Sequence, residues 1–155
     1  NKMHWAAHGQ TAAEVITQRA DASQPHMGLT SFTGMRPRRS DVAIAKNYLN
    51  AEELEMLNRI VMAYLEFAEL QARRHRSMTM VDWVQKLDDF LKLGDHEVLS
   101  HAGRVSAEEA RLKAEAEYEN YRQQLDALPA PVEKDMIKAL ESAAKALPKP
   151  KGKKK

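Results

Sequence analysis

Apolar residues recur every three or four positions over most of this chain, and this spacing predicts amphipathic helices. The longest such segment covers residues 51–74, follows a capping residue at Asn50, and is apolar on two sides. A helix that is apolar over more than half of its circumference is normally covered on both sides. We therefore expect 51–74 to be the central helix, with a buried core that includes Leu57, Val61, Leu65 and Trp83.

Capping residues and helix-breaking residues predict where the other helices begin and end. Thr11 and Ser106 each stand three residues before a glutamate, which is the spacing of a capping box. Thr79 opens a helix that stops at Gly94, and Ser40 is expected to cap a helix over residues 41–49. No alternation typical of strands is evident. The chain is therefore predicted to be all-α, a bundle of five or six helices around the segment 51–74.

Residues 21–39 form a long connection without a helical period, and a connection of this length in a compact domain is usually functional or mobile. We expect a helical domain over residues 1–128 that includes this loop, a C-terminal helix over 129–147, and a disordered lysine-rich tail over 148–155. The chain begins with Asn1 rather than Met. We therefore expect it to be a piece of a longer protein whose N-terminal part is missing.

The net charge of +2 is unevenly distributed. Residues 145–155 hold six lysines and no acid, so the net charge becomes −4 over residues 1–144 once those six positive charges are removed. Such a run can bind nucleic acid or simply remain solvated. The chain has no cysteine, which excludes disulfides and thiolate chemistry and suits the cytoplasm. No apolar run approaches the roughly 18 residues of a membrane span, so we expect no membrane association.

One group of polar residues is a candidate site. Arg19 and Asp21 end the first helix, Lys46 and Asn47 follow the loop, and Glu66 lies midway along the most apolar helix. A charge at that position is costly unless it is paired, so an Arg19–Glu66 or a Lys46–Glu66 pair would pin the loop over the central helix. The same side chains around a pocket would form an acid–base site. Both interpretations stay open.

A second candidate is a basic cluster that precedes Ser40 and could bind a phosphate or carboxylate beside a helix N-terminus. Arginines at the end of the central helix would extend it if the fold brought them close, and the alternative is ordinary solvated charge. The residues are Arg36, Arg38, Arg39, Arg73 and Arg74.

His4 and His8 have the spacing of two ligands on one helix face, but no third ligand is implied. We expect an ordinary N-terminal turn there, with no metal and no cofactor. Trp5 could serve as a stacking surface, although packing is its expected role.

Seven strings in this chain occur in a recognisable order: NKMHWAAHG, TAAEVITQRAD, MGLTSFTG, DVAIAKNYL, LNRIV, MTMVDWVQKLDDFL and GRVSAEEA. Together they resemble the C-terminal region of the RhuM family of bacterial virulence-associated proteins, over about residues 1–121. The resemblance implies a two-part protein, in which an N-terminal region similar to a helix-turn-helix DNA-binding module precedes this helical region. It implies no reaction. The chain also lacks the H-P-F-x-x-G-N-G-R string of Fic/Doc-type toxins, with which the family is compared.

We expect a C-terminal interaction or effector-sensing module of a DNA-associated, virulence-type protein rather than an enzyme. Its expected partners are DNA, through the missing N-terminal region and the lysine tail, and a protein or a second copy of the chain. The alternative is an enzyme that acts on nucleic acid or a nucleotide through the polar group that contains Arg19 and Glu66. A pocket that gathers this group would favour the enzyme, and a broad apolar patch on the helix over 106–125 would favour the interaction module.

Overall fold

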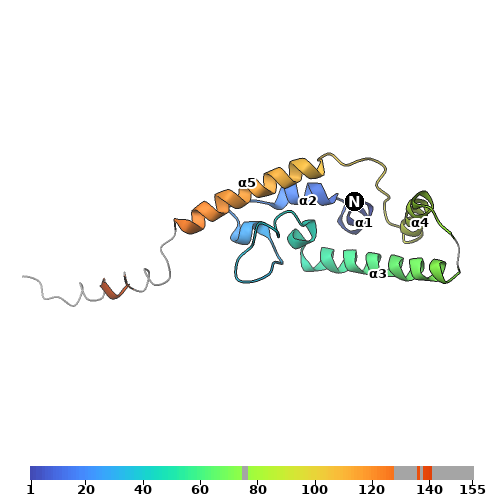
Figure 1. The fold of residues 1–155 in the computed structure, drawn as a ribbon, viewed down its shortest axis with the longest axis horizontal. Helices are drawn as coiled ribbons and strands as arrows, with labels where there is room; N and C mark the ends of the chain where they lie inside the picture. The colour runs from blue at the N-terminus through green and yellow to red at the C-terminus, as the bar shows by residue number, and fades with distance from the viewer. Residues whose placement is uncertain (75–76, 128–135, 137, 141–155) are drawn as a thin grey trace, which may run out of the picture. The chain divides into compact units, whose positions relative to one another are not determined.

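The computed structural model describes residues 1–74, 77–127, 136 and 138–140, and these contain helices and no strand (Figure 1). The predicted all-α class is confirmed. None of the helices in this part of the chain combines the length and hydropathy of a membrane span. With η for a 3-10 helix, the elements are α1 (Lys2–His8), α2 (Ala12–Arg19), η1 (Pro25–Gly28), η2 (Ala45–Tyr48), α3 (Ala51–Arg73), α4 (Met80–Leu93) and α5 (Ala107–Asp126).

The chain divides into two compact units, Asn1–Tyr121 and Arg122–Lys155. The expected C-terminal helix over 129–147 lies outside the described residues, apart from 136 and 138–140, and the expected lysine-rich tail over 148–155 lies wholly outside them. The core and the candidate sites that follow all belong to the first unit.

Capping boxes set the starts of the longer helices, as the sequence predicts. The Thr11 hydroxyl accepts a hydrogen bond from the Glu14 amide at 3.3 Å, and the Glu14 carboxylate accepts one from the Thr11 amide at 2.8 Å. These bonds satisfy amides that the first turn of a helix leaves without partners. The same reciprocal arrangement occurs at Asn50–Glu53, Thr79–Asp82 and Ser106–Glu109.

The prediction of a helix over residues 41–49 is wrong. Residues 39–43 form turns, and within 41–49 only η2 is helical. Side chains stabilise residues 38–48 by hydrogen bonds to backbone atoms of the same segment. The Asp41 carboxylate accepts from the Arg38 amide at 2.9 Å, and the Tyr48 hydroxyl donates to the Val42 carbonyl at 2.8 Å. An aspartate that binds nearby backbone amides stabilises a turn in competition with the helical ladder.

The loop between α2 and η2 is anchored by buried side chains such as Met27 and Leu29, although most of residues 30–40 are exposed. Its backbone passes through three successive left-handed residues, His26, Met27 and Gly28, with φ of 54°, 60° and 78°. This conformation costs roughly 1–2 kcal/mol for each residue that has a side chain. Met27, which is fully buried, offsets that cost by filling the core.

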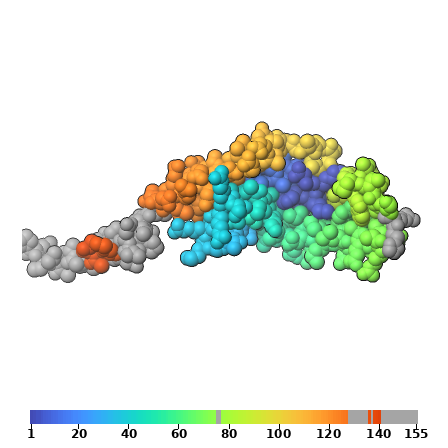
Figure 2. All heavy atoms as spheres, in the orientation of Figure 1, coloured from blue at the N-terminus to red at the C-terminus, as the bar shows by residue number. Residues whose placement is uncertain are grey.

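The core lies around α2 and the loop, not around the middle of α3. Of the residues predicted to be buried on the central helix, Leu57 is buried, Val61 is partly exposed and Leu65 is 60% exposed; Trp83 is also partly exposed. The helix does have two apolar sides, but only one is covered. In Figure 2, the atoms of α3 line one edge of the first unit. The largest fully buried side chains are Thr11, Val15, Met27, Val42, Tyr48, Leu49 and Leu91.

This placement of the core predicts a large loss of stability for one leucine-to-alanine substitution and a small loss for another. Leu49→Ala should lower the free energy of unfolding by about 2–5 kcal/mol, because Leu49 is 1% exposed and its loss leaves a cavity. Leu65→Ala should change it by less than about 1 kcal/mol, because that side chain is mostly in solvent. Chemical denaturation of both variants measures the difference. Equal losses would contradict the placement.

Candidate functional site

Arg19 ends α2 and connects it to the residues that begin α3. Its Nη1 and Nη2 atoms donate to the two carboxylate oxygens of Glu53, both at 2.6 Å, and Nη1 also donates to the Tyr48 carbonyl at 2.9 Å. The same Glu53 carboxylate accepts from the Asn50 amide at 3.0 Å and completes the cap of α3. One guanidinium therefore pins both ends of the long loop.

The prediction that Glu66 is the acid partner of Arg19 is wrong. Glu66 is exposed on α3. At a rise of 1.5 Å per residue it lies about 20 Å along the helix from Glu53. The expectation that a cation pins the loop through an acid holds for Arg19, but the acid comes from the first turn of α3.

Charge strengthens the Arg19–Glu53 contact. The hydrogen bonds from Arg19 lower the pKa of Glu53 from its ordinary 4.5 to about 2, although burial opposes the change. The hydrogen bond to Glu53 in turn raises the pKa of Arg19. The two side chains are 29% and 19% exposed, so this pair is partly screened by water.

Two histidines lie on α1, a helix where the sequence predicts only a turn, and His8 is close enough to interact with the charges of Arg19 and Glu53. The Nδ1 atom of His4 and the Nε2 atom of His8 are 3.0 Å apart, so one ring donates to the other. Burial lowers the pKa of His4 to about 4, and burial is also the largest cause of the lowered pKa of His8. Both rings are therefore neutral at pH 7. Within the described residues, no group of three or more His, Asp or Glu side chains is placed to hold a metal ion.

The other residues of the predicted polar group do not come together. The Asp21 carboxylate accepts from the amide and the hydroxyl of Ser23 in an exposed turn, at 2.8 and 2.7 Å. Asn47 is buried, and its side-chain amide donates to the Asp41 carbonyl at 3.0 Å. Lys46 is exposed and lines a cavity of about 490 Å³ next to His4. Most of this group therefore supports the loop instead of lining one pocket.

The predicted basic cluster is also divided. Arg36 and Arg38 are exposed, whereas Arg39 pairs with Glu115 of α5 at 2.7 Å. Arg73 pairs with Glu69 at 2.6 Å, at the end of α3 that lies away from the loop (Figure 1). Since α3 extends for about 33 Å, the arginines at its C-terminal end do not join those of the loop.

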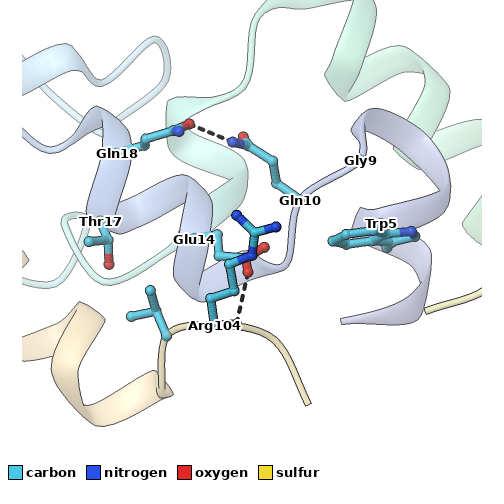
Figure 3. A pocket seen from close by; sticks show the side chains of 8 residues that line it. Trp5, Gly9, Gln10, Glu14, Thr17, Gln18 and Arg104 are labelled. Carbon is cyan, nitrogen blue, oxygen red and sulfur yellow. Dashed lines mark hydrogen bonds between the residues drawn. The ribbon is translucent and has the colours of Figure 1, made fainter. Parts of the chain in front are cut away.

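A pocket of about 330 Å³ is the site that the sequence did not indicate. It forms between the residues of α1 and α2 and the segment that precedes α5 (Figure 3). In the close view the indole of Trp5 stands at one side, and the guanidinium of Arg104 extends over Glu14. The ring of Trp5 is held edge-on against His101, with centroids 5.1 Å apart. The lining residues are Trp5, Gly9, Gln10, Glu14, Thr17, Gln18, Arg104 and Val105.

Glu14 is held in this pocket by the backbone. One carboxylate oxygen accepts from the Thr11 amide at 2.8 Å, and the other accepts from the Arg104 amide at 2.9 Å. These two backbone hydrogen bonds lower its pKa, so Glu14 stays ionised. Beside it, the Gln10 side-chain amide donates to Gln18. No local motif could predict this site, because Trp5 and Arg104 lie far apart in the sequence.

A small all-α domain with an anchored loop and a pocket lined by an indole, a guanidinium and side-chain amides is the class that these features define. A family model described as the Virulence protein RhuM family matches residues 1–128, and the chain belongs to that family. No curated protein and no solved structure matches it.

The Arg19 anchor predicts a difference between two glutamates of the same helix. Glu53→Gln should lower the free energy of unfolding by about 1–3 kcal/mol, because it removes a charge-assisted bidentate contact. Glu66→Gln should change it by less than about 0.5 kcal/mol, because Glu66 is exposed. Urea denaturation of both variants at pH 7 provides the comparison, and a larger loss for Glu66→Gln would refute the anchor.

The same pair predicts a pH dependence. Folding lowers the pKa of Glu53 from 4.5 to about 2, so its contribution is fully present above about pH 4.5 and is lost as the pH falls toward 2. The stability difference between the wild type and Glu53→Gln should therefore shrink over that range. Urea denaturation at several pH values measures it, and a difference independent of pH would contradict the assigned charge.

Proposed function

We propose that this chain is an effector-binding module of a DNA-associated RhuM protein. In this proposal, the pocket between Trp5 and Arg104 holds a small molecule that has an aromatic ring and one anionic group. The observation that supports it is the composition of the pocket, in which an indole, a guanidinium and two side-chain amides surround about 330 Å³.

Size and chemistry agree with a ligand of this class. Ligand pockets generally measure about 300–1,000 Å³, so this one suits a ligand of one or two fused rings. The indole of Trp5 offers a flat apolar surface, and a guanidinium forms paired hydrogen bonds with a carboxylate or phosphate. Two backbone amides are the main causes of the lowered pKa of Glu14, and the charge of the Arg104 side chain is the smallest of the causes. The guanidinium can then pair with an incoming anion.

The same contacts favour binding over the alternative of an enzyme acting on a nucleotide. A general base must accept a proton, but both oxygens of Glu14 accept backbone hydrogen bonds and its pKa is lowered. The polar group that the enzyme hypothesis requires is used largely in supporting the loop. Turnover of a nucleotide by the purified chain would reverse this preference.

The association with DNA rests on the sequence. The six lysines of residues 145–155 carry no compensating acid, and lysines that contact phosphates release counterions from DNA. The RhuM resemblance implies, in addition, a region similar to a helix-turn-helix DNA-binding module. The effector module would then report the presence of its ligand to a protein held on DNA.

The pocket can be tested by fluorescence, because the chain has two tryptophans. Trp83→Phe leaves Trp5 as the reporter, and indole-3-carboxylate and adenosine monophosphate serve as separate probes. We expect a saturable change in Trp5 emission with at least one of them. In the same background, Arg104→Gln should weaken binding by about tenfold or more, since it removes a charged hydrogen-bond donor.

Arg36→Gln is the matched control, because Arg36 is an exposed arginine that does not line the pocket. It should leave the affinity unchanged. An Arg104→Gln variant that binds as tightly as its parent would contradict the proposed role of the guanidinium, and no saturable change with either probe would contradict the ligand class.

The lysine run is tested by deleting residues 148–155, which contain five lysines. The melting temperature should stay almost unchanged, and DNA binding should weaken. The slope of log K against log salt should become shallower by up to about 4.5, because each of the five phosphate contacts contributes about 0.9. A full-length chain in which these five lysines are replaced by glutamine shows whether the loss of DNA binding comes from the missing charges or from the shorter chain. A large drop in the melting temperature, or an unchanged slope, would refute this role.

A further inference from the structure

The outer side of α3 carries apolar side chains in solvent. Met62, Leu65 and Leu70 are 66%, 60% and 58% exposed, and Met56 is 43% exposed. On α5, where a broad apolar patch would favour an interaction module, Leu112 is the exposed large apolar residue within the described range. A group of exposed apolar residues on one helix commonly marks an interaction surface.

Two ion pairs flank this apolar stretch along the helix. Glu55 pairs with Arg59 at 2.6 Å, and Glu69 pairs with Arg73 at 2.6 Å. These four residues recur at helical spacing with Met62, so they share the outer side of α3. On that side the paired charges run acid, base before Met62 and acid, base after it, and Glu66, which is also exposed, follows Met62 by one turn.

This order is complementary to itself when reversed. Glu55 and Arg73 lie nine positions either side of residue 64, and Arg59 and Glu69 lie five positions either side of it. In an antiparallel pair of α3 helices centred there, Glu55 faces Arg73 of the partner subunit, and Arg59 faces Glu69 of the partner subunit. A parallel pair would instead place each charge opposite its own copy. The charges therefore select the antiparallel arrangement.

We propose that a second copy of this chain packs against the outer side of α3 in this antiparallel register. The contact is two-fold symmetric, so each charged pair occurs twice. Near the axis Met62 faces Glu66 of the partner subunit, and Leu65 flanks this pair. Figure 1 and Figure 2 show α3 along the edge of the first unit, where a second helix has access to it in these views. This inference is independent of the Trp5 pocket.

Two charge-swapped variants of the full chain test the register. E55R/R59E and E69R/R73E each keep one acid and one base in every pair within the helix, so α3 should remain folded. In either variant alone, like charges meet at both symmetric contacts. We expect the dissociation constant of the dimer to rise by about tenfold or more in each, as measured by analytical ultracentrifugation.

Mixing the two variants in equal amounts restores opposite charges at both contacts and should restore dimers. The chain with all four swaps should also dimerise like the wild type. The apolar centre is tested by Leu65→Glu, which should give monomers, against Leu112→Glu on α5 as the matched control, which should not. Circular dichroism melting confirms that each variant is folded.

Three outcomes would overturn the proposal. The first is a wild-type chain that stays monomeric up to millimolar concentration. The second is a pair of swapped variants that dimerise as tightly as the wild type. The third is that mixing fails to restore the dimer, which would show that α3 does not associate in this register.

Discussion

The guanidinium of Arg19, the last residue of α2, binds the carbonyl of Tyr48 and pairs with Glu53, whose carboxylate also completes the capping box of α3. Helix α2 carries the pocket side chains Glu14 and Gln18 on the same short segment. Anchoring one end of α2 therefore sets the position of one wall of the pocket. The loop, the start of α3 and the pocket all depend on this contact.

The accuracy of the sequence-based predictions followed the range of the interactions involved. Thr79 and Ser106 were assigned as caps because their partners lie three residues away, and local bonds determine where such helices begin. The fold class and the extent of α3 followed from the same local pattern. Leu65 was misplaced because its periodicity shows that it is apolar but not which neighbour covers it.

The candidate site was harder to predict for the same reason. Glu53 has the signature of an ordinary first-turn acid, and nothing local shows that it is also the partner of Arg19. The pocket joins Trp5 to Arg104, which only the folded chain brings together. What could be foreseen was that a long loop needs a charged anchor, because unpaired charge near a core is costly.

The left-handed turn in the loop has a consequence for how the chain tolerates mutation. A Cβ atom on Gly28 would lie 2.3 Å from the carbonyl oxygen of Arg19, and a backbone atom cannot move aside as a side-chain tip can. Ser23 and Gln24, a few residues earlier, are exposed. In a library selected for folded chains, positions 23 and 24 would therefore accept many amino-acid types, whereas position 28 would accept almost only glycine. The left-handed turn in this loop thus depends on a residue that has no side chain.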